Sequence, residues 1–128
     1  MASLTAHSRK KWRAAGYFLE QAEHISRAGK FTRRHDLFGF TDLVAVKAGS
    51  IIFLQVTSWS NVSARCNKIA RESHGQGQYA TPMAEIAKNL MSNLGVRIVV
   101  EGWKLDANNR WVSREIEITP QELDRRKL

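Results

Sequence analysis

The sequence predicts a single α/β domain in which helices flank a mixed β-sheet. Segments with the roughly 3.6-residue periodicity of amphipathic helices occur together with segments rich in β-branched and aromatic residues. The 128 residues, 43% hydrophobic and 25% charged, have a globular composition and can form one hydrophobic core. We therefore expect one domain over residues 1–128, with 119–128 as a short helix or a flexible tail.

Three segments are expected in the N-terminal part. Leu4–Ala15 predicts a helix, with Ser3 as its N-cap and Gly16 ending it in a left-handed turn. Tyr17–Ile25 fits either a helix or a strand, and its Tyr-Phe-Leu start after a glycine favours the strand. Ser26–His35 is polar and basic, which predicts a loop or turn.

The centre of the chain predicts a β-hairpin. Leu37–Val46 and Ile51–Thr57 are rich in β-branched and aromatic residues, and the glycine-containing turn Lys47–Ser50 joins them. Both faces of these strands are apolar, which indicates a hairpin in the middle of a covered sheet.

Two amphipathic helices are expected next. The first is Asn61–Glu72 with Ser60 as its N-cap, and the second is Pro82–Leu94 with Thr81 as its N-cap. The loop Ser73–Tyr79 connects them. Their expected buried residues are Val62, Cys66, Ile69, Ala70, Met83, Ile86, Ala87, Leu90, Met91 and Leu94.

A second hairpin completes the expected sheet. Val96–Leu105 and Arg110–Ile118 have strand composition, and the polar turn Asp106–Asn109 separates them. The order of elements is therefore helix, strand, hairpin, helix, helix, hairpin.

The chain carries a strong positive charge. Twenty Lys and Arg against twelve Asp and Glu give a formal net charge of +8, and residues 1–35 alone carry eight basic and two acidic residues. Such a region favours a polyanionic partner, either nucleic acid or an anionic membrane, and nucleic acid ranks above a basic surface without a specific partner. No apolar run is long enough to span a membrane, and the N-terminus lacks the pattern of a secretory signal. The single cysteine, Cys66, makes the cytoplasm the expected location.

Polar residues gather at the open end of the central hairpin. If the turn is symmetric about Ala48 and Gly49, Asp42 lies directly across from Gln55, and Thr57 shares their side of the sheet. A carboxylate in an otherwise apolar strand needs a partner, a metal or a proton. Two interpretations stay open: Asp42 caps a loop or pairs with an arginine, or it belongs to a functional site.

The next predicted helix favours phosphate binding near this point. Its N-terminus, near Ser58–Asn61, offers backbone N–H groups and the positive end of the helix dipole. Arg65 and Lys68 lie in its following turns, and the Arg33–Arg34 run is expected to enter from the other side. Hard cations such as Mg²⁺ prefer oxygen ligands. The available oxygens belong to the side chains of Asp42 and Gln55 and to the Val56 carbonyl.

These segments resemble the core of the PD-(D/E)XK nucleases. Asp42–Val46, a glycine-containing turn and Ile51–Ser58 are similar to the archaeal Holliday junction resolvase and VRR-Nuc branches of that superfamily. Asp36–Asp42 and Asn61–Arg65 look like segments of its small phage and bacterial members. The resemblance covers roughly residues 4–104. It implies a restriction-endonuclease-like fold and a Mg²⁺- or Mn²⁺-dependent endonuclease that cleaves DNA, including branched or structured DNA, as a homodimer.

The motif positions of the family are Asp, then Glu or Asp, then Lys, where this chain has Asp42, Gln55 and Thr57. Glutamine keeps an oxygen without a charge, and threonine removes the ammonium group, for which Lys68 or Arg65 could substitute. Resolvase-type members often carry a glutamate on the first helix, which has no acidic residue here. Its possible replacements are Glu20, Glu23 and Asp36.

The candidate residues fall into three groups. The catalytic candidates are Asp42, Gln55, Thr57 and Lys68. The metal-ligand candidates are Asp42, Gln55, Val56 and Asp36. The nucleic-acid-binding candidates are Arg33, Arg34, Ser58, Ser60, Arg65, Lys10, Lys11 and Arg13.

Three functions follow in order of preference. The first is a metal-dependent DNA endonuclease, the second a nuclease-fold protein that binds nucleic acid without cutting it, and the third a basic module that binds protein. The four histidines and one cysteine lack the paired spacing of a zinc site. His35, beside Asp36, is interpreted as a surface residue rather than a base.

Overall fold

A computed structural model describes residues 3–22, 24–28 and 31–128 of the chain. The helices are α1 (Leu4–Ala14), α2 (Val62–Arg71), α3 (Met83–Leu94) and α4 (Pro120–Arg126), with 3₁₀ turns η1 (Trp59–Asn61) and η2 (Gly77–Tyr79). The main sheet contains β1 (Phe18–Gln21), β4 (Leu43–Lys47), β5 (Ser50–Ser58), β8 (Arg97–Leu105) and β9 (Trp111–Ile118). Two smaller strand pairs are β2 (His24–Ala28) with β3 (Phe31–His35), and β6 (Ser73–His74) with β7 (Thr81–Pro82).

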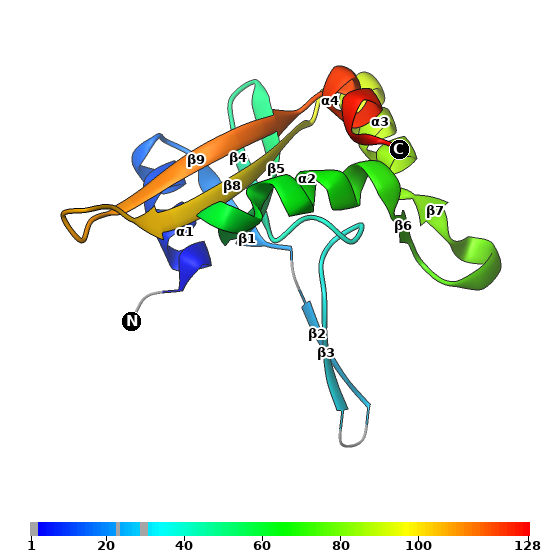
Figure 1. Cartoon of the computed structure of the whole chain (residues 1–128), viewed down its shortest axis with the longest axis horizontal. Helices are drawn as coiled ribbons and strands as arrows, with labels where there is room; N and C mark the ends of the chain where they lie inside the picture. The colour runs from blue at the N-terminus through cyan, green and yellow to red at the C-terminus, as the bar shows by residue number, and fades with distance from the viewer. Residues whose placement is uncertain (1–2, 23, 29–30) are drawn as a thin grey trace.

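The five strands of the main sheet follow the order β1-β4-β5-β8-β9, with β5 and β8 parallel and the other pairs antiparallel. Helices cover both faces, with α1 on one side and α2 on the other (Figure 1). The expected mixed α/β sheet flanked by helices is therefore confirmed. Within the described ranges, no helix combines the length and apolar character needed to cross a bilayer.

The central hairpin has the expected register. Lys47 pairs with Ser50 and Leu43 with Leu54, as a turn centred on Ala48 and Gly49 requires. The first strand, however, begins at Leu43 rather than at Leu37.

The segment before this strand forms a turn instead of extended backbone. The backbone N–H of Leu37 donates to the Thr41 carbonyl at 3.1 Å, and a single bridge joins these two residues. Phe38 and Gly39 between them have φ angles of 57° and 83°. Left-handed backbone at two successive positions cannot continue a strand.

The two faces of the sheet carry separate cores. Against α1 lie buried residues including Leu43, Ala45, Ile52 and Leu54, so this face of the central hairpin is covered as expected. The opposite face packs against α2, α3 and α4, but only over part of the hairpin. Val46 and Ile51, near the turn, are 40% and 38% exposed, so the expectation of two covered faces is wrong there.

The N-terminal segments are confirmed in part. The Ser3 hydroxyl accepts a hydrogen bond from the backbone N–H of Ala6 at 3.2 Å, and Gly16 has a φ of 93°, as expected for the two ends of α1. The expected strand exists as β1 but ends at Gln21. The loop expected over residues 26–35 is wrong, because β2 and β3 form an antiparallel hairpin that projects from the main sheet (Figure 1).

Two expected helix caps are also wrong. Ser60 lies inside η1, which precedes α2 and places Asn61 at its N-cap without a capping side chain. Thr81 pairs with His74 in the β6–β7 bridge, so Pro82 takes the N-cap position of α3. The 3₁₀ turn η1 precedes α2 and the strand β7 precedes α3, so neither expected residue lies at the helix N-cap.

The buried stripes of α2 and α3 are as expected except at their last member. Leu94 is 66% exposed, while the other nine residues are buried or partly buried in the core. The C-terminal segment forms a helix rather than a frayed end, and the Thr119 hydroxyl caps it through the backbone N–H of Glu122 at 3.1 Å.

A buried carboxylate on β8 joins α1 to the sheet. Glu101 has no exposed surface, and it accepts hydrogen bonds from Ser8 Oγ at 2.5 Å, Lys11 Nζ at 2.6 Å and Trp12 Nε1 at 3.2 Å. Trp103 Nε1 donates to Ser8 Oγ at 2.8 Å. Because every donor in this set but one comes from a single helix, the network fixes both the position and the rotation of α1.

Lys11 also contacts Glu115 of β9 at 2.5 Å. Burial alone lowers the pKa of Lys11, but its hydrogen bonds and charge interactions with Glu101 and Glu115 raise the pKa above its usual value. The ammonium group is therefore held by two carboxylates. These contacts give Lys11 a structural role, while its expected role in nucleic-acid binding stays a prediction.

We expect Lys11→Met to lower the free energy of unfolding by about 2–3 kcal/mol, because the buried carboxylate of Glu101 loses its countercharge. This loss of unfolding free energy is smaller than the loss expected for breaking a fully buried ion pair, because the Lys11 side chain is partly exposed. Urea denaturation at neutral pH measures the change.

The matched control is Lys10→Met, an exposed neighbour on the same helix, with an expected change below about 0.5 kcal/mol. Since folding raises the pKa of Lys11, its contribution is present below the unfolded value of 10.5 and is lost at higher pH. Equal effects of the two substitutions would contradict the proposed role of Glu101.

Candidate functional site

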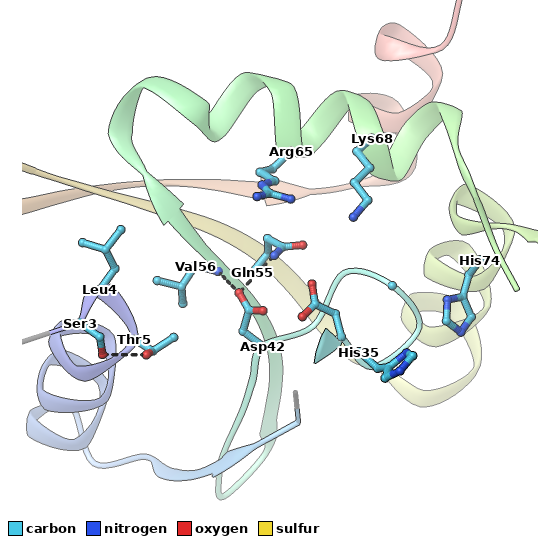
Figure 2. Close-up of a pocket in the computed structure, with 12 residues that line it drawn as sticks. Ser3, Leu4, Thr5, His35, Asp42, Gln55, Val56, Arg65, Lys68 and His74 are labelled. Atoms are coloured by element: carbon cyan, nitrogen blue, oxygen red, sulfur yellow. Dashed lines mark hydrogen bonds between the residues drawn. The ribbon is translucent and has the colours of Figure 1, made fainter. Parts of the chain in front are cut away.

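A cavity of about 540 Å³ opens where the start of α1, the open end of the β4–β5 hairpin and α2 meet (Figure 2). Six of the residues predicted from the sequence line it: Asp36, Asp42, Gln55, Val56, Arg65 and Lys68. These residues come from the segment that precedes β4, from β5 and from α2, so the fold brings together side chains that are up to 32 positions apart in the sequence.

Asp42 and Gln55 form the floor of the cavity. Asp42 directly precedes β4, and its backbone N–H donates to the Leu54 carbonyl at 2.8 Å. Its Oδ2 accepts hydrogen bonds from the Val56 N–H at 2.7 Å and from Gln55 Nε2 at 3.1 Å. The expected neighbourhood of Asp42 and Gln55 at the end of one hairpin is confirmed.

The amide of Gln55 keeps one unused acceptor. A carboxylate only accepts hydrogen bonds, so Gln55 must present its nitrogen to Asp42, and its oxygen lies on the other side. Gln55 is 3% exposed, and its Oε1 has no hydrogen-bond partner among the residues that the structure describes. A buried acceptor without a donor costs about 1–3 kcal/mol, so this atom is suited to a ligand that donates a hydrogen bond or carries positive charge.

Arg65 and Lys68 form the opposite wall. They are three residues apart on α2, which places them on neighbouring positions of one helix face. Figure 2 shows both side chains extending from α2 toward Gln55 and Asp42. The buried stripe of α2 packs on the sheet and leaves this adjoining face to the cavity. Arg65 Nε is buried and has no hydrogen-bond partner within the described part of the chain.

A glycine sets how closely α2 approaches the sheet. Gly102 lies on β8 beside Thr57, and a Cβ atom there would collide with a methyl group of Val62 and lie 2.9 Å from Trp59 Cα. The start of α2 therefore rests directly on the sheet backbone. Because Arg65 lies on α2 and Gln55 on the sheet, this close contact determines how near Arg65 comes to Gln55.

The start of α1 contributes the third side of the cavity. Ser3, Leu4 and Thr5 line it, and the hydroxyls of Ser3 and Thr5 lie 3.0 Å apart. The positive end of the helix dipole therefore faces the same space as Arg65 and Lys68. Together these groups favour an anion.

The donor set fits a hard cation only through mixed ligands. The described residues contain no group of three or more His, Cys, Asp or Glu side chains that could hold a metal. A cation would take the Asp42 carboxylate, Gln55 Oε1 and the Val56 carbonyl, with Asp36 in the same cavity. The unused Gln55 oxygen is the observation that fits this assignment.

Several predicted site residues lie outside the cavity lining. Thr57 is 6% exposed and is paired with Gly102, where η1 covers the sheet. Ser58 and Ser60 are exposed around η1, and Lys10 and Arg13 are exposed on α1. None of these five residues is among the lining residues.

The remaining candidates belong to the N-terminal part of the chain. Arg33 and Arg34 lie on β3, directly before His35, which lines the cavity. Of the three acidic replacements, Asp36 lines the cavity, Glu20 is exposed on β1 and does not, and Glu23 lies outside the described residues.

Sequence reasoning missed the contributions of α1 and of His74. His74 lines the cavity from β6, and Ser3 and Thr5 line it from the helix start. His35, which was expected to be a surface residue, is partly exposed and lines the cavity. No local pattern marks these residues, because their positions depend on how distant elements pack.

We expect Asp42→Ala to destabilise the protein more than Asp42→Asn does. Alanine leaves the Val56 N–H and the Gln55 amide without their acceptor, at a cost of about 1–3 kcal/mol, whereas asparagine keeps an oxygen for one of them. Urea denaturation of the two variants measures the difference. Equal stabilities would contradict the hydrogen bonding described for Asp42.

The chain was compared with known proteins in three ways. No family model matches it, and neither the search of curated proteins nor the search of solved structures returned a match.

Proposed function

We propose that this protein binds DNA and hydrolyses its phosphodiester bonds with Mg²⁺ or Mn²⁺ as cofactor. The observation that carries the proposal is the cavity itself, in which Asp42 and the unused oxygen of Gln55 lie opposite Arg65 and Lys68. A phosphodiester needs this combination, because its negative oxygens require cationic partners while a cation beside them requires oxygen ligands.

Each wall of the cavity has its own role in this proposal. Arg65, Lys68 and the start of α1 hold the phosphate and neutralise its charge. Asp42, Gln55 and the Val56 carbonyl would hold the cation, with Asp36 in the same cavity. A bound metal would supply an activated water and stabilise charge on the phosphate. Lys68 takes the place of the missing lysine at Thr57, since Thr57 lies outside the cavity lining.

The resemblance to the PD-(D/E)XK nucleases supports the same proposal. It adds branched or structured DNA as a substrate and a homodimer as the working form, while the single cysteine, Cys66, favours the cytoplasm as the location. The net charge of +8 suits the DNA partner.

The second candidate function is DNA binding without cleavage. It is favoured by the neutral side chains of Gln55 and Thr57, which leave Asp42 as the one acidic residue of the motif. A site with fewer anionic ligands holds a hard cation more weakly. The same cavity would then bind phosphate through Arg65 and Lys68 alone.

A cleavage assay with Mg²⁺ and Mn²⁺ on duplex, single-stranded and branched DNA separates the two candidates. We expect Asp42→Asn to lower the cleavage rate by at least about 100-fold while the protein stays folded, because the main anionic ligand is lost. Gln55→Glu should strengthen metal binding, measured by calorimetry, because it adds a second carboxylate.

Lys68→Ala should lower the cleavage rate by about 10- to 100-fold. The matched control is Lys88→Ala on α3, which removes an exposed lysine outside the cavity and should leave the rate unchanged. DNA binding without cleavage under any metal would establish the second candidate. Full activity of Asp42→Asn would show that the assigned site is wrong.

A further inference from the structure

We infer that the β2–β3 hairpin is an arm that enters the major groove of double-stranded DNA. The inference rests on the proposed function and specifies its substrate as a B-form duplex beside the cavity. The arm consists of β2 and β3, which pair where the sequence predicted a loop.

The hairpin stands apart from the rest of the fold. β2 and β3 pair with each other through five cross-strand positions, from His24 with His35 to Ala28 with Phe31, and belong to a separate sheet. Figure 1 shows this pair projecting away from the main sheet and its helices. A two-stranded hairpin outside a core is only marginally stable in water, so a binding partner would stabilise it.

The charge of the segment identifies the kind of partner. Residues 24–35 contain four basic residues, Arg27, Lys30, Arg33 and Arg34, and no aspartate or glutamate. The register places Arg33 across from Ser26 and Arg34 across from Ile25. Because neighbouring positions of a strand belong to opposite faces, basic positions occur on both faces of the hairpin. A polyanion that surrounds the hairpin on both sides matches this distribution.

The dimensions of the hairpin favour duplex DNA. Five residues at about 3.3 Å each give strands of roughly 16 Å, and a two-stranded ribbon fits a major groove about 12 Å wide and 8.5 Å deep. The phosphates of both DNA strands then line the two sides of the ribbon. A-form RNA has a major groove too narrow for this, and single strands are bound mainly by aromatic stacking. The hairpin contains one aromatic residue besides histidine, Phe31.

The hairpin also joins the cavity directly. β3 ends at His35, and His35 and Asp36 both line the cavity. A duplex held by the hairpin therefore has one of its sugar-phosphate strands next to Arg65, Lys68 and Asp42. The arm positions the substrate, while the cavity carries out the chemistry.

The test compares two double variants of the full chain that remove the same charge. Arg33→Gln/Arg34→Gln alters the arm, and Arg125→Gln/Lys127→Gln alters exposed basic residues at the C-terminus. Binding of a 20-base-pair DNA duplex, the corresponding single strand and an RNA duplex is measured across a salt series without divalent metal. Circular dichroism confirms that both variants are folded.

We expect the arm variant to bind duplex DNA about 10- to 30-fold more weakly, with the slope of log K against log salt reduced by about 2. The C-terminal variant should bind as the wild type does. Arg27→Gln alone should reduce the slope by about 1. Wild-type protein should protect guanine N7, a major-groove atom, from dimethyl sulfate, and the arm variant should lose this protection.

Unchanged duplex binding by the arm variant would overturn the inference, as would a wild-type preference for single strands or RNA. The outcomes are separable from those of the proposed function. A protein that binds duplex DNA through the arm but cleaves nothing supports the arm and rejects the nuclease. A protein whose arm variant still binds and cleaves duplex DNA at the wild-type level rejects the arm and supports the nuclease.

Discussion

The buried carboxylate of Glu101 is the constraint on which the arrangement of the site depends. A charge with no exposed surface must find donors inside the protein, and α1 supplies three of them from Ser8, Lys11 and Trp12. Because all three must reach one carboxylate, the helix has a single rotation and position along the sheet. That position brings Ser3 and the positive end of the helix to the cavity. An apolar contact alone would allow the helix to slide or turn.

The next residue of the same strand controls the other layer. Neighbouring strand residues belong to opposite faces, so Glu101 faces α1 and Gly102 faces η1 and α2. The missing side chain of Gly102 lets the start of α2 rest on the sheet, and this sets the distance from Arg65 to Gln55. Two successive residues thus determine both helical walls of one cavity. Hydrogen bonding to Glu101 positions α1 on one face of the sheet, and the close contact at Gly102 positions α2 on the other.

Local patterns explain what the sequence could predict. The turn centred on Gly49 fixes the register that joins Asp42 to Gln55, and the stripe of α2 fixes the side on which Arg65 and Lys68 lie. Long-range effects explain the errors. His74 and the start of α1 reach the cavity only through tertiary packing. The two N-cap predictions for α2 and α3 were wrong because η1 or β7 precedes the helix. The β2–β3 hairpin was missed because residues 26–35 are mostly polar and basic, and they lack the alternation of apolar residues on which strand prediction relies.

The neutral pair at positions 55 and 57 is consistent with the electrostatics of a buried strand. Relative to the nuclease motif that is proposed for this chain, glutamine and threonine remove one negative and one positive charge together, so the net charge of the two positions is unchanged. Both side chains are almost fully buried, at 3% and 6% exposure, where a charged pair carries a large desolvation cost. Lys68 places a cation at the partly exposed wall instead, where water still reaches it. A carboxylate at position 55 would be buried beside Asp42 and would need a bound cation between them, so metal affinity and stability without metal should change in opposite directions there.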